Sequence, residues 1–548
     1  MIKKNTSLIK IGIDLDNTVI SYDRAFQKAA ITFGFVEENC TLLKKALRDK
    51  IRKKPDGERK WQELQGFVYG AGINEAVLFP GVYRFLWRCR EKNIQVEIVS
   101  HKTEFGHFDK EKISLHDSAT KFLTNHSLLD NNNPLIKKVT YKSTRLEKLE
   151  YVKLQNYEWF IDDLEEIIFS KELKNQKGIM FSSDNVSKTN SIKFVKSSWE
   201  SISQSILGNW SISEVMNMAN KIGNQSEVEN IVKLKGRGNS AIYKLHFFDG
   251  SKAALKMYPE ITYHDRLRSE FESTKIFREL KINNVQIPIS FDIDLSVATY
   301  EWIEGTSVSN YGVNELKAAL SFLNDINQNS TADQFKFFPM AADACPKGLD
   351  IENQIKRRLL QFDNATKNYI ELERFLKDDF EPLMSEIISW SQAIWPSSCG
   401  YKKPIDKSEL ILSPSDFGFH NAIYSQKKSL IFHDFEYFGW DDPVKLISDF
   451  SHHAAMDLSE ELEQLWFSGA SEIYGENLLG RLRAAWPLYG LNWCLIILNE
   501  FKDELWNRRI IADDSKALLR DEYLSTQLAK SKNKLNALAL IYKNKFFW

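Results

Sequence analysis

The sequence predicts a two-domain protein of the α/β class, with a mainly parallel α/β sheet first and a bilobal α+β domain after it. Three observations support this. The chain has 548 residues, too many for one ordinary hydrophobic core. Its first third alternates short apolar runs with helix-like stretches, and a polar segment rich in Ser and Asn separates that third from a long, mostly helical remainder.

In the first third, the apolar runs have the length of buried strands, and the stretches between them have helical periodicity. The expected strands are "IKIGIDL", "IQVEIVS", "IKKVTY", "EWFIDD" and "KGIMFSS"; the expected helices include "RAFQKAAITFGF" and "VYRFLWRCREK". Strands that alternate with helices favour a parallel sheet, whose catalytic groups gather beyond the carboxyl ends of the strands.

A domain boundary is expected near Gly208, so that the domains cover residues 1–207 and 208–548. Just before it, "FVKSSWESISQSIL" indicates a closing strand and helix. After it, β-like runs with a "DG" hairpin signal predict a lobe at about 208–305. A helical lobe at about 306–548 follows, broken by short strands around "LILSPSD" and "SLIFHDFEYF".

Composition favours a soluble cytoplasmic protein. The chain has 73 Lys and Arg against 74 Asp and Glu, so no overall field favours nucleic acid or an anionic membrane. Its five dispersed cysteines have no metal-type spacing, as in a reducing compartment. The N-terminus is too polar for a signal peptide, and the apolar "WCLIIL" is too short to span a bilayer.

Carboxylates follow two of the expected strands in the first domain. Asp14 and Asp16 come after the first strand, Asp162 and Asp163 end "EWFIDD", and Ser100 ends "IQVEIVS". If these strands are neighbours, their polar ends converge. Clustered carboxylates repel one another unless a cation neutralises them, and oxygen-only ligands favour Mg²⁺. One Asp can then attack phosphorus while its neighbour protonates the leaving oxygen.

This ordered set resembles the haloacid dehalogenase (HAD) superfamily, in the motif DxDxT (Asp14, Asp16, Thr18) and in the later strand-end residues. The resemblance implies a Rossmann-like core with Asp14 as nucleophile and Asp16 as general acid and base. Both would also serve Mg²⁺, together with Asp162 and Asp163.

The resemblance also implies phosphate-binding residues: Thr18, Ser100 and a lysine. Lys142, Lys148 and Lys153 all precede "WFIDD"; we prefer Lys148, at the start of a helix-like stretch. An Asp at the second position of DxD points to phosphatase or phosphotransferase chemistry rather than dehalogenation.

Two inserts interrupt this domain. The one between Asp16 and Ser100, with "TLLKKALRDKIRKK" and "WQELQGFVYGAGI", predicts a small helical cap that closes over a small substrate. The other follows Ser100 and could line the entrance; its His101 and His107 are expected to be polar loop residues rather than metal ligands.

The second domain begins with a glycine turn between strand-like segments, where Gly236, Gly238 and Ser240 would let backbone N–H groups approach nucleotide phosphates. A plain hairpin turn is the alternative. Lys256 on the next strand and Glu270 on the following helix are the parts of an ion pair that aims a lysine at phosphates, with Glu272 as an alternative partner.

Further on, "SPSDFGFHN" and "IFHDFEYFG" contain an ordered set of polar residues. Asp416 could accept the proton of an attacking hydroxyl, and Asn421 and Asp434 could hold Mg²⁺ against ATP phosphates.

From about Val228 to the mid-400s, the sequence resembles the aminoglycoside phosphotransferase (APH) and choline-kinase-like family, a branch of the protein kinase-like fold; "DDPVKLISDF" extends the likeness. The resemblance implies an ATP-dependent kinase with Asp416 as catalytic base. It also implies a hinge, "TYEWIEG", that grips adenine through backbone groups near Glu301 and Ile303. The family's usual His-Gly before the catalytic Asp is replaced by Pro414-Ser415, which puts the geometry of this loop in question.

Together these features predict a bifunctional enzyme: a Mg²⁺-dependent phosphatase fused to a kinase that uses ATP and Mg²⁺. Its partners would be small phosphorylated and hydroxylated molecules such as sugars, polyols or amino alcohols, with surface-polysaccharide precursors as one setting. Three alternatives remain: a binding or regulatory first domain; a kinase that acts on a protein or an antibiotic; and a non-enzymatic interaction protein. The sequence does not determine the oligomeric state.

Overall fold

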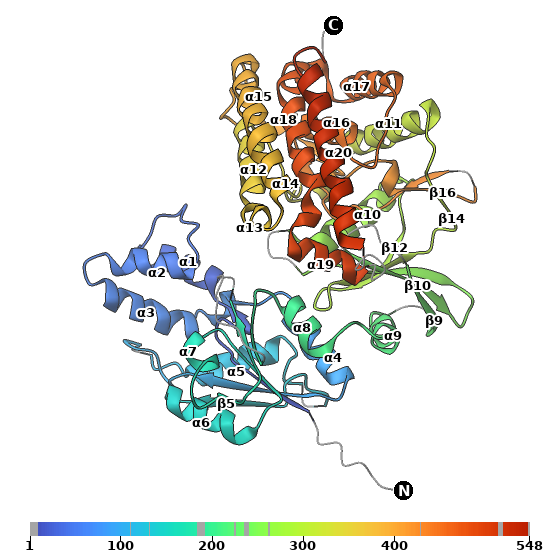
Figure 1. Ribbon diagram of the computed structural model, residues 1–548. Helices are drawn as coiled ribbons and strands as arrows, with labels where there is room; N and C mark the ends of the chain where they lie inside the picture. The colour runs from blue at the N-terminus through green and yellow to red at the C-terminus, as the bar shows by residue number, and fades with distance from the viewer. Residues whose placement is uncertain are drawn as a thin grey trace. The chain divides into compact units, whose positions relative to one another are not determined.

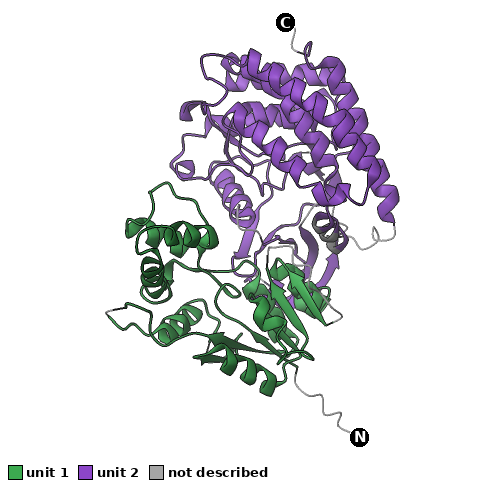
Figure 2. Ribbon diagram, turned by 60° about the vertical axis from the view of Figure 1, so that its left-hand side comes forward, with its two compact units in different colours: residues 1–215 green, residues 216–548 purple. Residues whose placement is uncertain are grey.

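The chain forms two compact units, Met1–Val215 and Met216–Trp548 (Figure 2). The structure is a computed structural model that describes residues 9–109, 111–130, 132–182, 192–223, 226–234, 240–260, 264–427, 429–512 and 519–545. The division falls inside helix α9 (Ile212–Lys221), later than the expected boundary between residues 207 and 208. Glu214 forms a buried ion pair with Arg88, and this contact ties the start of α9 to the first unit.

The first unit contains a six-stranded parallel sheet, so the parallel α/β sheet expected for the first third of the chain is confirmed. In order across the sheet, its strands are β5 (Lys138–Lys142), β4 (Gln95–His101), β1 (Lys10–Ile13), β6 (Trp159–Asp162), β7 (Gly178–Phe181) and β8 (Lys193–Lys196). Val96, Ile98 and Val99 on β4 are all buried, as expected for a strand covered on both faces.

The register of the three central strands brings their carboxyl ends together. Ile13 of β1 pairs with Ile98 of β4 on one side and with Ile161 of β6 on the other. The residues just beyond these pairs therefore lie at one edge of the sheet. Gly12 allows β1 to pack closely, because a Cβ there would lie 2.7 Å from the ring of Tyr157.

Helices surround this sheet and also form a separate layer beside its carboxyl edge (Figure 1). They are α1 (Asp23–Thr32), α2 (Lys44–Arg52), α3 (Gly57–Tyr69), α4 (Val82–Glu91), α5 (Leu115–Asn125), α6 (Arg145–Gln155), α7 (Glu165–Ile168) and α8 (Trp199–Leu207). The separate layer consists of α1, α2 and α3, which lie along the chain between two short paired strands, β2 (Ile20–Ser21) and β3 (Val77–Leu78). These helices form the small helical insert predicted between Asp16 and Ser100.

The second unit begins with a five-stranded antiparallel sheet. In order across the sheet, its strands are β12 (Pro288–Asp292), β13 (Val297–Glu301), β11 (Lys252–Met257), β10 (Ala241–Phe247) and β9 (Val228–Lys233). The predicted "DG" hairpin joins β10 to β11, and its Gly250 has a φ of +82°, which favours glycine. Helix α10 (Arg266–Glu279) follows β11 along the chain.

The rest of the second unit is mainly helical, as expected. Its helices are α11 (Val313–Gln328), α12 (Gly348–Leu360), α13 (Asp363–Thr366), α14 (Ile370–Arg374), α15 (Glu381–Ile394), α16 (Pro443–His452), α17 (Glu460–Tyr474), α18 (Leu479–Ile497), α19 (Asp503–Ala512) and α20 (Arg520–Ile541). Helix α18 is buried along most of its length and contacts α12, α15, α16 and α20.

Short strands accompany these helices. They are β14 (Gly305–Ser307), β16 (Ala422–Ser425) and β17 (Leu430–Phe432) in one small sheet, and β15 (Ile411–Ser413) with β18 (Gly439–Asp441) in another. Of these, β15 and β17 lie in the two segments where strands were predicted. Among the described residues, no helix combines the length and apolar character needed to cross a membrane.

Candidate active sites

In the first unit, a buried lysine lies between two carboxylates at the carboxyl edge of the sheet. Lys148 on α6 places its Nζ 2.5 Å from Asp14 Oδ1 and 2.7 Å from Asp162 Oδ2. Its side chain is 1% exposed, so these ion pairs are shielded from solvent. Of the three lysines considered from the sequence, Lys153 is exposed and Lys142 packs against the ring of Tyr151; Lys148 is the one in contact with Asp14.

The carboxylates at this edge are suited to hold a divalent cation. One oxygen from each of Asp14, Asp162 and Asp163 lies within 4.8 Å of the others. Burial raises the pKa of Asp14, and the neighbouring acids add to this effect while Lys148 opposes it. Burial and Asp162 likewise raise the pKa of Asp163 to about 7. A cation bound by these oxygens would relieve the repulsion, and oxygen-only ligands fit Mg²⁺.

Asp16 has a different environment from Asp14. Its carboxylate accepts a hydrogen bond from the Tyr22 hydroxyl at 2.7 Å and pairs with Lys102 Nζ at 2.8 Å. Lys102 lies two residues beyond Ser100 and was missed in the sequence analysis. The signal available there was its place directly after a strand that ends at the site.

Two hydroxyl groups complete this edge. Thr18 Oγ1 is buried and lies 3.4 Å from Asp14 Oδ2. The Oγ of Ser100 is buried and has no hydrogen-bond partner among the described residues. A buried hydroxyl without a partner is costly in a folded protein, so a bound oxyanion is a fitting partner for Ser100.

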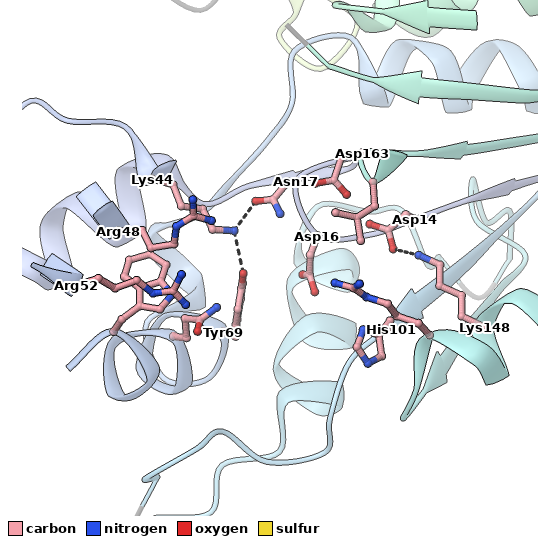
Figure 3. Close-up of a pocket in the computed structure, with 14 residues that line it drawn as sticks. Asp14, Asp16, Asn17, Lys44, Arg48, Arg52, Tyr69, His101, Lys148 and Asp163 are labelled. Atoms are coloured by element: carbon pink, nitrogen blue, oxygen red, sulfur yellow. Dashed lines mark hydrogen bonds and ion pairs between the residues drawn. The ribbon is translucent and has the colours of Figure 1, made fainter. Parts of the chain in front are cut away.

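A cavity of about 390 Å³ opens in front of these residues (Figure 3). The sheet edge contributes Asp14, Asp16 and Asp163, α6 contributes Lys148, and the helical layer contributes side chains from α2 and α3. His101, the last residue of β4 and the first of the insert predicted to line the entrance, also lines the cavity. This volume is at the lower end of the range for small-molecule sites.

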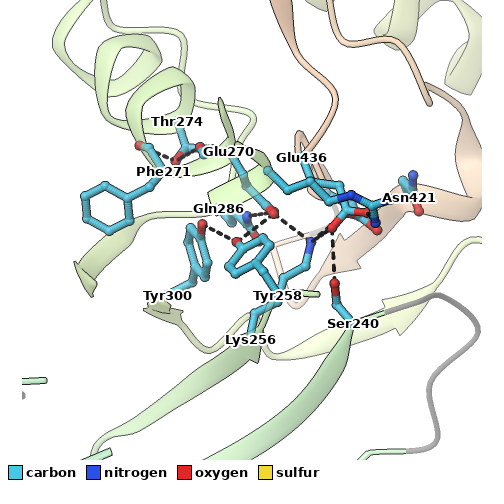
Figure 4. Close-up of polar contacts among 12 residues, drawn as sticks. Ser240, Lys256, Tyr258, Glu270, Phe271, Thr274, Gln286, Tyr300, Asn421 and Glu436 are labelled. Carbon is cyan, nitrogen blue, oxygen red and sulfur yellow. Dashed lines mark hydrogen bonds and ion pairs between the residues drawn. The ribbon is translucent and has the colours of Figure 1, made fainter. Parts of the chain in front are cut away.

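In the second unit, another buried lysine lies between carboxylates (Figure 4). Lys256 on β11 places its Nζ 2.6 Å from Glu270 Oε2 and 2.6 Å from Asp434 Oδ1. Burial alone would lower the pKa of Lys256, but the charges of Asp434 and Glu270 together raise this pKa well above the ordinary value. The charged form of the lysine is therefore favoured beside these acids. The predicted partner Glu270, rather than Glu272, is the one in contact.

Neutral groups hold Glu270 in this position. The Tyr258 hydroxyl donates to Glu270 Oε2 at 2.7 Å and Gln286 Nε2 donates to Oε1 at 2.6 Å, while Tyr258 and Tyr300 share a hydrogen bond. The lysine is therefore fixed from α10 as well as from its own strand.

Glu436 is a further acidic residue that the sequence analysis missed. It lies 3.3 Å from Lys256 Nζ, forms an ion pair with Arg266 at 2.8 Å and accepts a hydrogen bond from Ser240 Oγ at 3.1 Å. Ser240 is thereby joined to this cluster, whereas Gly236 and Gly238 lie outside the described residues. The available sequence signal for Glu436 was its place two residues after Asp434.

Asp416 is held by two histidines that the sequence did not single out. Its Oδ1 lies 3.2 Å from His420 Nε2 and 3.3 Å from His453 Nε2, and the two rings stack with centroids 3.8 Å apart. Burial alone would raise the pKa of Asp416, but the hydrogen bonds and charge of these histidines lower it well below the ordinary value. The ionised form is therefore favoured.

The Asp416, His420 and His453 group resembles a metal site in its ligand types, but its hydrogen bonds argue against one. The N–H of Ala455 donates to His453 Nδ1 at 3.1 Å. A neutral His453 must then carry its proton on Nε2, the atom that faces Asp416. This nitrogen donates a hydrogen bond and cannot also bind a metal.

In the loop before Asp416, one residue has an unfavourable backbone conformation. Ser415 has a φ of +65°, in the left-handed region that favours glycine. Its hydroxyl accepts a hydrogen bond from Lys445 at 3.3 Å, and its N–H donates to Ser413 Oγ at 3.1 Å. Side-chain contacts thus support a backbone conformation that costs energy for a non-glycine residue.

Asn421 lies near Asp416, and Asp434 lies near Lys256. Asn421 Nδ2 donates to the carbonyl oxygen of Asp416 at 2.9 Å, so Oδ1 is the side-chain atom that could bind a cation. The N–H of His433, next to Asp434, donates to the Asn421 carbonyl at 3.0 Å. The expected pair of oxygen ligands therefore lies on adjoining backbone segments, and oxygen donors of this kind fit Mg²⁺.

The expected hinge lies at the end of β13. Glu301 is the last residue of this strand, and its N–H donates to the Ile287 carbonyl at 2.8 Å. Ile303 follows in the link to β14 and is half-buried.

Comparison with known proteins gives matches only at the level of structure. No protein-family model matches the sequence, and no curated protein sequence matches it at a significant level. Among solved structures, the chain is similar to spectinomycin phosphotransferase APH(9)-Ia in complex with ADP and spectinomycin, with 12% identity and a TM-score of 0.44 over 61% of this chain and 99% of that one.

The chain is also similar to two further solved structures of phosphotransferases. Choline kinase LicA from Streptococcus pneumoniae has 14% identity and a TM-score of 0.37, over 59% of this chain and 98% of that one. The gentamicin complex of APH(2")-IIa has 16% identity and a TM-score of 0.39, over 60% and 96%. Because these TM-scores are below 0.5, we base the functional proposal on contacts within this chain.

Proposed function

We propose that this protein is a bifunctional enzyme: its first unit hydrolyses a small phosphomonoester, and its second unit transfers the γ-phosphoryl group of ATP to a hydroxyl of a small metabolite. The observation that carries the proposal occurs in each unit. A buried lysine, Lys148 or Lys256, lies between carboxylates from separate segments of the chain. This arrangement supplies positive charge for phosphate beside acids that can bind a cation.

In the first unit, Asp14 is the proposed nucleophile. One of its carboxylate oxygens attacks phosphorus, the bond from phosphorus to the leaving oxygen breaks, and Asp16 protonates that oxygen. Water then attacks the aspartyl-phosphate and gives a proton back to Asp16, which releases phosphate and restores Asp14. Lys148, Thr18 and Ser100 hold the phosphoryl oxygens in both steps.

The proposed metal at this site is Mg²⁺, held by Asp14, Asp16, Asp162 and Asp163. When bound, it offsets the charge of the acids and of the phosphate. The carboxylate-only donor set described above supports this choice.

In the second unit, Asp416 is the proposed base. The acceptor hydroxyl attacks the γ-phosphorus of ATP and gives its proton to Asp416, the bond from phosphorus to the bridging oxygen breaks, and ADP leaves. Lys256, oriented by Glu270, binds the ATP phosphates. Asn421 and Asp434 would hold Mg²⁺, and the segment at Glu301 and Ile303 would bind adenine through its backbone. Gly236, Gly238 and Ser240 are proposed, from the sequence, to bind the ATP phosphates.

The substrates we propose are sugars, polyols or amino alcohols and their phosphates, such as precursors of a surface polysaccharide. One site adds phosphate and the other removes it. Unless they act on different positions or different molecules, the enzyme would only hydrolyse ATP, so we propose that the two sites treat successive intermediates.

Paired substitutions test this assignment. Asp14→Asn should abolish phosphate release from phosphomonoesters and leave ATP-dependent phosphorylation intact, whereas Asp416→Asn should have the opposite effect. The assay is a screen of sugar phosphates, polyols and amino alcohols with Mg²⁺ and labelled ATP. Unchanged phosphate release by Asp14→Asn would instead support a regulatory first unit. Labelling of protein alone, or of an aminoglycoside alone, would overturn the choice of acceptor.

A further inference from the structure

The cavity of the first unit has charges of opposite sign at its two sides. One side has Asp14, Asp16 and Asp163 together with the cations Arg145 and Lys148 of α6, and the reacting phosphate and its cation are proposed to bind there. Helix α2 contributes Lys44, Arg48 and Arg52, which are spaced by four residues and so lie along one face of the helix. Figure 3 shows these three side chains facing Asp16 across the cavity. We call them the α2 cationic stripe.

The two arginines of this stripe can exchange their present acidic partners for a bound anion. Arg48 pairs with Asp49 at 3.1 Å and Arg52 with Glu58 at 2.7 Å. The acids in these pairs are 54% and 57% exposed, and ion pairs in contact with solvent contribute little. Exchanging such a partner for a bound anion therefore costs little.

Lys44 is the more deeply placed member of the stripe. Its Nζ donates to Asn17 Oδ1 at 2.7 Å and to the Tyr69 hydroxyl at 2.9 Å, both neutral oxygens. Burial lowers the pKa of Lys44, and nearby acids such as Asp16 act against that effect. An anion beside this ammonium would offset its burial directly.

The neutral wall of the cavity comes from α3. Trp61, Gln65 and Tyr69 are also spaced by four residues and lie along its cavity face. Trp61 is held in place by stacking on Phe26, with ring centroids 4.9 Å apart. The wall can therefore contact the uncharged body of a small molecule whose two ends meet the sheet edge and the stripe.

We propose that the first unit selects phosphomonoesters that carry a second anionic group, a phosphate or a carboxylate, which the α2 cationic stripe binds while the first phosphate reacts at Asp14. This proposal rests on the phosphatase function proposed above. It adds a substrate class to that function: a sugar bisphosphate or a phosphorylated sugar acid rather than a simple sugar phosphate.

Matched substrates and variants of the full-length protein test this selection. The measurement is kcat/KM for phosphate release from fructose 1,6-bisphosphate against fructose 6-phosphate, and from 6-phosphogluconate against glucose 6-phosphate. We expect the doubly anionic member of at least one pair to be preferred about tenfold or more, and the preferred pair identifies the second anion. Arg48→Gln should reduce that preference about tenfold, as loss of a charged hydrogen bond does. Lys50→Gln, an exposed cation on another face of α2, should leave it unchanged.

A binding measurement separates this proposal from the phosphatase proposal. In the Asp14→Asn background, calorimetry should show that fructose 1,6-bisphosphate or 6-phosphogluconate binds more tightly than its singly anionic partner. Adding Arg48→Gln should weaken that binding about tenfold. If the variant binds selectively but the wild-type protein releases no phosphate, the phosphatase function is contradicted and the site for a second anion is not. Equal binding within both pairs, or an equal loss for both members on Arg48→Gln, would overturn the stripe as a site for a second anion.

Discussion

At the scale of single residues, a buried lysine organises each site, and its removal affects both charge and stability. Lys148 faces Asp14 and Asp162 at hydrogen-bond distance in a place with 1% exposure. Breaking a buried ion pair by removing one partner leaves the other charge unpaired, at a cost of about 3–5 kcal/mol. The lysine is therefore expected to matter for folding as well as for phosphate binding.

Lys148→Met should reduce phosphate release about 100-fold or more, because a preorganised donor to the phosphoryl oxygens is lost. Steady-state kinetics with Mg²⁺ measure this effect, and circular dichroism checks that the variant is folded. Lys153→Met is the matched control: the residue lies on the same helix, is exposed, and should keep activity within about twofold. A loss with Lys153→Met and not with Lys148→Met would contradict the assignment.

Asp441 predicts a pH dependence of stability that is separate from the chemistry. Burial raises its pKa to about 7, although Lys445 and the N–H groups of Cys345 and Asp442 act the other way. The folded state then holds this proton more tightly than the unfolded state. The stabilisation is fully present below about pH 4 and is lost as the pH rises through about 7, by on the order of 4 kcal/mol at most.

Asp441→Asn should therefore lose less stability than the wild type between pH 5 and pH 8. The amide oxygen of asparagine can still accept the hydrogen bonds from Cys345 and Asp442, at 3.0 and 2.8 Å in the wild type. Urea midpoints followed by tryptophan fluorescence at the two pH values measure the difference. The same decrease in both proteins would show that Asp441 does not titrate in this range.

At the scale of elements, Arg88 of α4 joins the end of α8 and the start of α9 to the first unit. Its guanidinium pairs with Glu214 at 2.9 Å, donates to Ser203 Oγ at 2.8 Å and to the carbonyls of Gly208 and Asn209 at 3.1 Å each. It also lies over the ring of Trp210, 4.3 Å from the centroid. One side chain thus satisfies several groups that have no regular secondary-structure partner.

Arg88→Met should destabilise the first unit by about 2 kcal/mol or more, because Glu214 would keep only Lys92 as a cationic partner and the acceptors on Ser203, Gly208 and Asn209 would lose their donor. Arg90→Met is the control on the same helix, since Arg90 pairs only with the adjacent Glu91 among the described contacts and should change stability by less than about 0.5 kcal/mol. Thermal unfolding measures both, and limited proteolysis near residues 208–211 reports local opening. Equal effects of the two substitutions would contradict this role.

At the scale of the whole molecule, the two proposed activities have opposite directions, so their order can be read from an intermediate. When the full-length protein is supplied with ATP, Mg²⁺ and a hydroxylated acceptor that already carries one phosphate, Asp14→Asn should accumulate a doubly phosphorylated compound that the wild type converts further. Phosphorus NMR of the reaction measures this accumulation.

The identity of the accumulated compound shows whether the two sites act on different positions or on the same one. A doubly phosphorylated compound in Asp14→Asn and a singly phosphorylated one in the wild type would support successive steps. If the wild type instead returns the starting acceptor while it consumes ATP, the two sites act on the same position, and the proposal of successive intermediates fails.

Much of the fold could be predicted from sequence because its signals are local. Continuous apolar runs bounded by polar residues predicted the strands that form the parallel sheet, and "DG" predicted the β10–β11 hairpin. The order of Asp14, Ser100 and Asp162 at strand ends was also readable, because parallel strands place their carboxyl ends at one edge.

The tertiary structure alone decided which distant residues meet. The sequence favoured Lys148 over Lys142 and Lys153 only by its place at the start of a helix-like stretch; the contact itself depends on which face of α6 covers the edge of the sheet. His453, just after the end of α16, contacts Asp416, and Glu436 contacts Ser240 and Arg266. These contacts join segments that are far apart in the sequence, and no sequence pattern links them. The sequence by itself determined the strands, helices and polar strand ends, because these follow from local backbone preference and burial pattern. Packing alone decided the ion pairs, the α2 cationic stripe and the division after Val215, because these depend on how separate elements meet in space.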